Sequence, residues 1–243
     1  MKKQHEFEFR KLLATFFLLY ISTQAYSVPI GHAPWVGETL SGVACRGDAE
    51  NFGPYDYMLR QQLPSELHIV ESYHFKPDVE QLIVGPGKTE NYIPANLDYT
   101  LRAWPNHHRA LNSISRYRIN NLKKRSSGRY PPAECYLQRA INFSPRDPTA
   151  HMLYAIFLQR TNQNDAALEE YRIAEELDPV SVQVKYNLGL LLVELGKYDE
   201  ALRYAQDVYT SEFPLPGLKQ KLKRAGRWQE PTDSAEESPP VTP

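Results

Sequence analysis

The feature that most constrains this 243-residue chain is an internal repeat with a spacing of 34 residues. Residues 148–181 align without a gap on residues 182–215, so two consecutive segments share one pattern. A period of this length indicates supersecondary units that stack on their neighbours, rather than a domain built around one central core. Small and large residues recur at matched places: Ala155 aligns with Gly189, Ala167 with Ala201, and Leu158 with Leu192.

The alternation of small and large residues predicts two antiparallel helices in each unit. Small side chains let paired helices approach closely, and large ones fill the space between adjacent units. Gly196 is placed to end the first helix of its unit, and Pro179 stops the second helix of the preceding unit. A shift of a further 34 residues towards the N-terminus gives a degenerate unit over 114–147, with a helix expected over 132–143. Three units are about the minimum that buries a continuous core.

The string YNLGLLLVELGKYDEAL, residues 186–202, closely resembles the tetratricopeptide repeat. The resemblance implies a mainly α-helical fold, a helical-hairpin solenoid of about three units over 111–228 with its C-terminal capping helix. We expect that capping helix within residues 215–228, with Leu218, Leu222 and Ala225 on its buried stripe. The remaining residues, 229–243, are acidic and proline-rich, which is typical of disorder.

Residues 28–110 do not follow the repeat and predict a small α+β segment. Apolar residues alternate over 67–75 and over 97–104, which favours two strands. Between them, Pro77 is suited to begin a short helix that ends at Gly85 or Gly87, and a further helix is expected from Pro105. We expect this segment to pack against the first helices of the repeat.

The first 27 residues have the order of a secretory signal peptide. A charged stretch precedes ten mostly apolar residues, 12–21, and small residues follow, with cleavage expected after Ala25 or Ser27. The apolar run is too short for a membrane span, so we expect no stable span after cleavage. The chain is therefore predicted to be exported, to the periplasm or the medium. The alternative is an uncleaved anchor.

Export affects the interpretation of the two cysteines. In an oxidising compartment, Cys45 and Cys135 are expected to form one disulfide, and two unpaired thiols are the alternative. Such a bond would close a loop of about 90 residues and contribute roughly 4–5 kcal/mol to the free energy of unfolding. It would attach the loop around Cys45 to the second helix of the degenerate unit.

The resemblance to the repeat family also indicates where a partner would bind. Ligand-facing side chains in that family come from the first helix of each unit, so a partner is expected on the concave face of the stack. Asn187 stands where some members bind a peptide's terminal carboxylate, but Met152 stands where an accompanying lysine would be. The alternative is that several of these residues are buried under the N-terminal segment. The residues assigned to partner binding are Arg118, Met152, Ile156, Arg160, Tyr186, Asn187 and Leu190.

The composition excludes binding that is driven by net charge. The net charge is −1, and without the first 27 residues 24 basic groups face 27 acidic ones, so we expect no nucleic-acid partner. No nucleotide-binding or hydrolase motif is present, and we expect no cofactor and no metal. The predicted role is a non-catalytic scaffold in the cell envelope that binds a peptide or protein. The string NFGPYDY resembles those of exported bacterial proteins that combine such a leader with a few tetratricopeptide repeats.

The alternative function is an enzyme or a metal-binding protein with its site in residues 45–110. His107 and His108 are adjacent, and on a helix they point about 100° apart, so together they do not form an i, i+4 ligand pair. A metal site would need help from His68, His74 or Asp98. Convergence of these side chains in the fold would favour the alternative.

Overall fold

The computed structural model describes residues 31–49, 52–122 and 129–228. The predicted signal peptide and the acidic tail lie outside these residues. Within them, no helix is long and apolar enough to cross a bilayer. The described elements are one short 3-10 helix and ten α-helices: η1 (Tyr57–Leu59), α2 (Pro64–His74), α3 (Pro77–Glu80), α4 (Tyr92–Ala103), α5 (His108–Asn120), α6 (Ala133–Phe143), α7 (Pro148–Arg160), α8 (Asn164–Leu177), α9 (Val182–Glu194), α10 (Tyr198–Thr210) and α11 (Gly217–Arg224).

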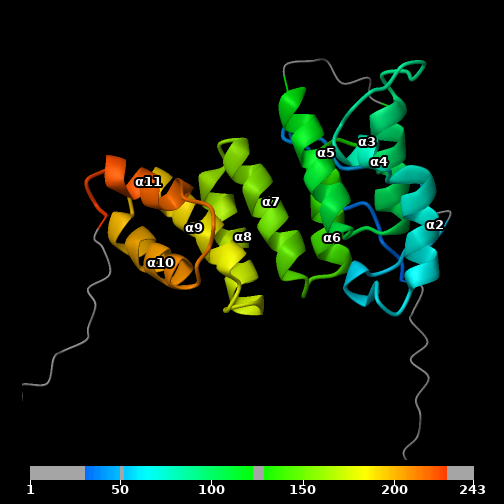
Figure 1. The fold of residues 1–243 in the computed structure, drawn as a ribbon. Helices are drawn as coiled ribbons and strands as arrows, with labels where there is room; N and C mark the ends of the chain where they lie inside the picture. Colours follow the sequence, from blue (N-terminus) through cyan, green and yellow to red (C-terminus); the bar gives the residue numbers. More distant parts are fainter. Residues whose placement is uncertain (1–30, 50–51, 123–128, 229–243) are drawn as a thin grey trace, which may run out of the picture. The chain divides into compact units, whose positions relative to one another are not determined.

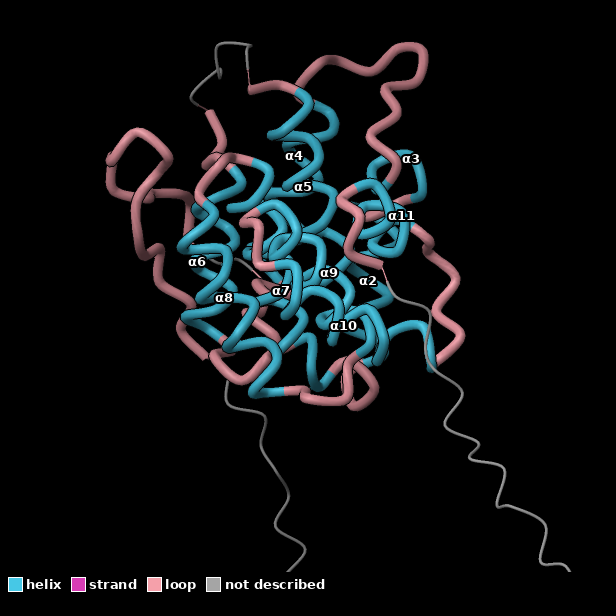
Figure 2. Tube along the Cα trace, turned by 90° about the vertical axis from the view of Figure 1, so that its left-hand side faces the viewer, coloured by secondary structure: helices cyan, strands magenta, loops and turns pink. Residues whose placement is uncertain are grey.

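The described residues contain no β-strand, so the predicted α+β segment is wrong. Figure 2 shows helices and loops alone, and the extended pairing is limited to a single bridge between Glu38 and Ala44. The two expected strands are the helices α2 and α4. In α4 the buried side chains Ile93, Leu97 and Leu101 follow a spacing of four, which is the helical period. The alternation over 97–104 contains part of this series, but it omits Ile93.

Two helix boundaries in this region also differ from the prediction. Helix α3 begins at Pro77 as expected, but it ends at Glu80, before either glycine, and Leu82 then takes a left-handed backbone with φ of 63°. Helix α5 begins at His108 rather than at Pro105. Its N-cap is His107, whose ring nitrogen Nδ1 accepts a hydrogen bond from the backbone N–H of Ala110. This imidazole takes the place of the usual hydroxyl or carboxylate cap.

From α5 onwards the helices form antiparallel pairs that follow one another along the chain (Figure 1). Helices α7 and α8 form one pair and α9 and α10 the next, and each second helix contacts the first helix of the following unit. Helix α11 packs on both α9 and α10, so it stands where the first helix of another unit would lie. Leu218 and Leu222 of α11 are buried as predicted, while Ala225 is exposed.

The close approach of the helices explains the small residues of the repeat. A Cβ atom at Gly189 would lie 2.6 Å from the Cδ2 atom of Leu218, so a larger residue would push α11 away from α9. The ends of the first helices also match. Asn162 and Gly196 are 34 positions apart, and both adopt left-handed backbone, with φ of 64° and 72°. Glycine adopts this conformation without strain, and asparagine tolerates it better than most residues.

The N-terminal segment 31–49 lies against helix α6 and is bonded to it. The predicted disulfide between Cys45 and Cys135 is present. The side-chain amide of Gln138 holds the backbone of Glu38 twice, accepting from its N–H at 3.1 Å and donating to its carbonyl oxygen at 2.7 Å. Arg139 is buried and donates to the carbonyl oxygen of Ala33 at 2.8 Å. This segment therefore forms part of the packed structure rather than a loose extension.

Candidate functional site

Side chains of α7 and α9 that are 35 positions apart, one more than the repeat spacing, lie next to each other and form one continuous surface. The side-chain amide of Asn187 lies 3.8 Å from the sulfur of Met152, 35 positions earlier in the chain. One to two turns further on, Gln159 donates to the carboxylate of Glu194 at 2.7 Å. The first helices of two units are therefore aligned side by side, as the repeat requires. We call the surface along these two helices the α7/α9 face.

Helix α11 extends the α7/α9 face by one further helix. The ammonium group of Lys221 donates to the other carboxylate oxygen of Glu194 at 2.6 Å. Burial raises the pKa of Glu194, but the bonds from Lys221 and Gln159 outweigh burial and lower the pKa overall. The carboxylate is therefore charged at neutral pH, and it links three helices through polar contacts.

The residues predicted to bind a partner differ in accessibility on this face. Ile156, Asn187 and Leu190 are partly exposed, and Arg160 is exposed, so these four can contact a ligand. Met152 is buried at the junction of the two helices. The structure thus places six of the seven predicted residues on α7 and α9, and four of these six are accessible on the α7/α9 face.

Tyr186 is buried against the residues that lead into α11. Its ring centroid lies 4.9 Å from that of Phe213, and its hydroxyl group occupies the space next to Gly217. Only 7% of the residue is exposed. A substitution at Tyr186 would disturb the packing of α11, so it cannot report on binding alone.

The seventh predicted residue, Arg118, lies on α5 and lines a cavity of about 670 Å³. Its Nε atom is 3.5 Å from the carboxylate of Glu134 on α6. The walls come from segment 39–48, α4, the C-terminal half of α5, and residues 129–135. The disulfide between Cys45 and Cys135 is part of the lining, so it fixes one wall to another.

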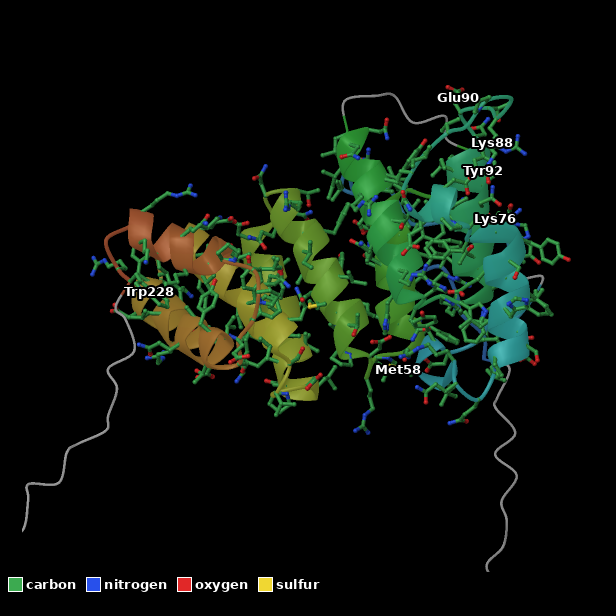
Figure 3. All side chains as sticks on the ribbon, viewed as in Figure 1. Met58, Lys76, Lys88, Glu90, Tyr92 and Trp228 are labelled. Carbon is green, nitrogen blue, oxygen red and sulfur yellow. A yellow bond between two sulfur atoms is a disulfide. The ribbon has the colours of Figure 1, made fainter. Side chains whose placement is uncertain are left out.

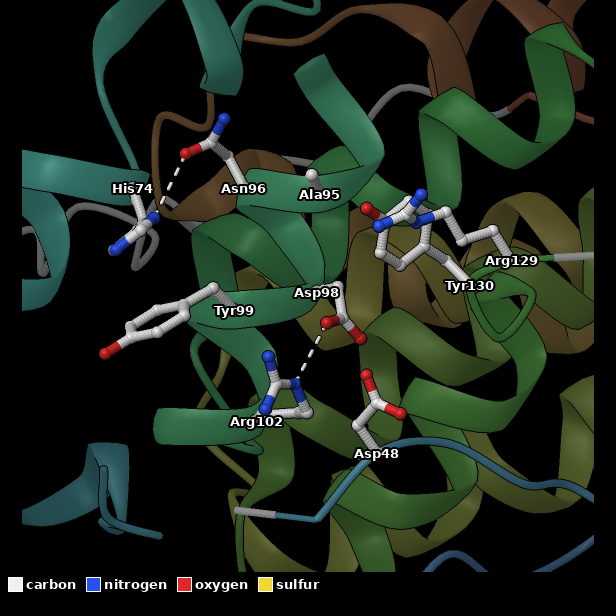
Figure 4. A pocket seen from close by; sticks show the side chains of 9 residues that line it. All are labelled: Asp48, His74, Ala95, Asn96, Asp98, Tyr99, Arg102, Arg129 and Tyr130. Carbon is white, nitrogen blue, oxygen red and sulfur yellow. Dashed lines mark hydrogen bonds and ion pairs between the residues drawn. The ribbon is translucent and has the colours of Figure 1, made fainter. Parts of the chain in front are cut away.

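A second cavity of about 320 Å³ adjoins the first. Both are lined by Asp48, Asp98, Arg129 and Tyr130 (Figure 4). Asp98 is buried, and it accepts hydrogen bonds from Arg102 at 2.9 Å and from the hydroxyl group of Tyr136 at 2.6 Å. This carboxylate already forms an ion pair with Arg102, which Figure 4 shows as a dashed line.

Most of the cavity lining was missed in the sequence. Arg46 lies outside the repeat, Tyr117, Arg129 and Tyr130 lie in the degenerate unit at positions that the repeat pattern does not mark, and only the fold brings the four together. One signal was available: if Cys45 is bonded to Cys135, its neighbours must lie at the start of the helix that contains Cys135. That pairing places Arg46 beside the segment 129–132, but it does not place Tyr117.

The histidines that could have formed a metal site each bind a different group. His108 contacts the carboxylate of Asp147 at 2.8 Å, and His74 contacts the side-chain oxygen of Asn96 at 3.1 Å. Within the described ranges, no group of three or more His, Cys, Asp or Glu side chains is placed to hold a metal ion. The side chains that the alternative function needed therefore do not converge.

The local contacts of His107 fix its proton. Its Nδ1 atom accepts from the backbone of Ala110, so the proton is on Nε2, which donates to Glu71 at 3.1 Å. Burial lowers the pKa of His107 despite the nearby carboxylate. The ring is therefore neutral at neutral pH, and it links α5 to α2.

A family model described as anaphase-promoting complex, cyclosome, subunit 3 matches residues 126–208, about a third of the chain. The match runs from before α6 into α10, so it covers the first aligned repeat unit and most of the second. Together with helix pairs that recur every 34 residues, the match supports a tetratricopeptide-type repeat in this part of the chain. A comparison with curated protein sequences gives no match.

Solved structures of repeat domains are also similar to the chain. The Sgt2 TPR domain from Aspergillus fumigatus is 18% identical, with a TM-score of 0.38, over 55% of this chain and 91% of that one. A structure of MamA is 15% identical, with a TM-score of 0.42, over 70% of this chain and 86% of that one. These identities and scores are too low for any property of Sgt2 or MamA to be transferred to this chain.

Proposed function

We propose that this chain is a non-catalytic scaffold that binds a peptide or protein partner along the α7/α9 face. The observation that carries the proposal is the alignment of α7 with α9, which places partly exposed apolar side chains and charged side chains in one continuous row. Ile156 and Leu190 can bury apolar groups of a ligand, while Arg160 and Asn187 can bind its polar groups. A surface of this kind suits an extended or helical peptide.

Among the seven residues assigned to partner binding, Met152 and Tyr186 have a structural role. Both are buried, so they hold α7, α9 and α11 in register rather than contact the ligand. Arg118 lies on α5, and α5 contacts α7, so a long ligand that runs along the face can continue towards Arg118. The contacting residues are then Ile156, Arg160, Asn187 and Leu190, with Arg118 at the end.

The test is quantitative affinity capture with the full chain and with single variants of it. Leu190→Glu places a charge on the face without removing a buried side chain, and Arg160→Glu reverses a charge there. Ile173→Glu on α8 is the control, because Ile173 is an exposed apolar residue that lies on a second helix of a unit. We expect the proteins captured by wild type and by Ile173→Glu to be lost from both face variants. Retention of the same partners by Leu190→Glu and Arg160→Glu contradicts the proposal.

We further propose that the protein acts outside the cytoplasm, in the periplasm or the medium. Two observations support this: the apolar run at residues 12–21 after a charged start, and a disulfide whose cysteines are both buried. Mass spectrometry of the protein recovered from fractionated cells tests it. The expected product lacks about 27 residues and is oxidised in the extracytoplasmic fraction. An intact, reduced chain in the cytosol contradicts it.

A further inference from the structure

The cavity between segment 39–48, α4, α5 and residues 129–135 has a size suited to a ligand. Its volume of about 670 Å³ lies within the range of a few hundred to a thousand Å³ that is usual for ligand pockets. The smaller cavity beside it adds further space behind Asp98. A single carboxylate ion would fill little of this volume, whereas two or three residues of a peptide would fill most of it.

Two of the acidic groups that line the cavity are already bound within the protein. Glu134 is buried, and it accepts from the backbone N–H of Leu40 at 3.1 Å and faces Arg118 at 3.5 Å. Asp98 is held by Arg102 and by Tyr136. These two carboxylates cannot bind a ligand cation without losing their present partners, so neither offers a free site for positive charge.

The basic groups that line the cavity have fewer partners within the protein than Asp98 and Glu134 have. Arg46 and Arg129 are exposed, and neither forms an ion pair with a carboxylate among the described residues. The guanidinium group of Arg129 lies 5.6 Å from the ring centre of Tyr130, and Arg118 contacts Glu134 only through Nε. Three guanidinium groups therefore have N–H donors that a ligand can use, and guanidinium binds carboxylate with two parallel hydrogen bonds.

Apolar and aromatic surface surrounds these donors. Tyr117 and Tyr130 line the cavity together with Pro94, Pro131 and Pro132. These side chains present flat apolar surfaces on which a neighbouring ligand residue can pack. The combination of guanidinium donors with aromatic and proline walls fits an acidic side chain that is flanked by an apolar one, rather than a free inorganic ion.

Two exposed carboxylates at the rim of the cavity partly offset the positive charge of the three arginine side chains. Asp48 and Glu90 both line the cavity and are exposed, and Figure 3 shows Glu90 beside Lys88 and Tyr92 ahead of α4. Neither side-chain carboxylate accepts a hydrogen bond or forms an ion pair within the described residues, although the backbone carbonyl oxygen of Asp48 accepts from Trp35 at 3.0 Å. They should weaken the binding of an acidic ligand and strengthen that of a basic one. Their effect therefore reports the sign of the ligand charge.

We propose that this cavity binds an acidic, extended segment of a partner protein, with its carboxylate on Arg46, Arg118 and Arg129 and an adjacent apolar residue on Tyr117 and Tyr130. The proposal rests on the function proposed above, since it names the chemistry of part of the partner. It adds a site at the N-terminal end of the described repeats that shares only Arg118 with the residues proposed for the α7/α9 face.

The experiment measures fluorescence anisotropy of three labelled peptides with the full chain. The probes have the sequence Glu-Leu-Pro-Glu-Leu-Pro, with glutamine or lysine in place of glutamate in the two counterparts. We expect the acidic peptide to bind about tenfold more tightly than the glutamine peptide, a difference of about 1.4 kcal/mol. Higher salt concentration should weaken its binding.

Charge variants then test the named residues. Arg46→Gln combined with Arg129→Gln should weaken the acidic peptide about tenfold, because each change removes a charged donor. Asp48→Asn combined with Glu90→Gln should strengthen it two- to fivefold, because repulsion is removed. Arg203→Gln on α10 is the matched control and should change nothing, since Arg203 is exposed and far from the lining residues in the sequence. All variants change exposed side chains, so we expect the folded structure to be kept.

Several results would overturn the proposal. Equal or tighter binding of the lysine peptide, or tighter binding after loss of Arg46 and Arg129, would reverse the assigned charge. Absence of saturable binding up to millimolar peptide would remove the site. Displacement of the peptide by inorganic phosphate, but not by chloride at equal ionic strength, would show a simple anion site.

The two proposals can fail separately. Loss of partner capture by Leu190→Glu with unchanged peptide binding would support the α7/α9 face independently of this cavity.

Discussion

The two halves of the described chain bury different kinds of side chain. Every buried polar or charged residue lies between Asp98 and His151, and the buried residues from Met152 to Leu222 are apolar, aromatic or glycine. The later repeats are thus held by shape and volume. The earlier region has an apolar core as well, and buried hydrogen bonds and one covalent bond add to it. The difference indicates that apolar packing is sufficient where the repeat pattern is regular, and that specific polar contacts supplement it where the pattern is degenerate.

The largest expected effect comes from the disulfide of the earlier region. Cys45→Ala combined with Cys135→Ala should lower the free energy of unfolding by about 4–5 kcal/mol, because the closed loop spans 90 residues. Urea unfolding followed by circular dichroism measures the loss, with the oxidised wild type as reference. A loss below about 1 kcal/mol would show that the hydrogen bonds of segment 31–49 hold it without the covalent bond.

The later repeats should respond to volume. Leu188 is fully buried between helices, so Leu188→Ala should cost about 3 kcal/mol of unfolding free energy through lost contacts and a cavity. Leu188→Met keeps the volume and should cost less than about 1.5 kcal/mol. Equal costs for the two variants in urea unfolding would break the comparison, because they would show that volume does not decide stability there.

The earlier region should respond to hydrogen bonding even when volume is kept. Asp147 is fully buried and accepts from Asn106, from His108 and from the backbone N–H groups of Thr149 and Ala150. Asp147→Asn is almost isosteric, but it turns an NH₂ group towards donors, and we expect a cost of about 2 kcal/mol. Thermal unfolding of Asp147→Asn and of Leu188→Met under the same conditions compares the two costs in stability. A cost below that of Leu188→Met would contradict the assigned basis of stability.

The smallest effect is a pH dependence at the boundary between the regions. Both ring nitrogens of His151 face acceptors, the carboxylate of Glu170 at 2.6 Å and the carbonyl oxygen of Pro145 at 3.1 Å. Burial lowers the pKa of His151, but these acceptors outweigh burial and raise it overall. The contribution to stability is therefore full below the unfolded pKa of about 6.5 and is lost as pH rises through the folded pKa.

His151→Gln isolates this contribution. The unfolding free energy of the wild type relative to the variant should fall between pH 6 and pH 9, as measured by urea unfolding at each pH. Glutamine keeps one donor to the carboxylate and does not titrate, so it serves as the control. A difference that does not change with pH would show that His151 carries no extra proton in the folded protein.

The sequence predicted the regular part of the fold because its signal is local and periodic. Residues 34 positions apart occupy equivalent places, from the small pairs Ala155 and Gly189 to the left-handed pair Asn162 and Gly196. The strands predicted before the repeat were wrong because short alternating runs also contain residues four apart. Leu97 and Leu101 fit both periods, and only the addition of Ile93 distinguishes them.

The candidate sites were predictable to different degrees for the same reason. Arg160, Asn187 and Leu190 could be assigned from their repeat positions. The burial of Tyr186 could not, because it depends on where the chain turns into α11. The cavity residues could not be assigned either, since Arg46 and Tyr117 meet only through the tertiary fold and the disulfide.

Hydrogen–deuterium exchange with mass spectrometry tests the difference between the two regions most directly. The measurement compares the oxidised protein with the variant that carries Cys45→Ala and Cys135→Ala. The account predicts faster exchange in segment 31–49 and in α4, α5 and α6, with α9, α10 and α11 unchanged, because the later repeats are held by their own apolar core. Faster exchange spread evenly over all of these helices would contradict it.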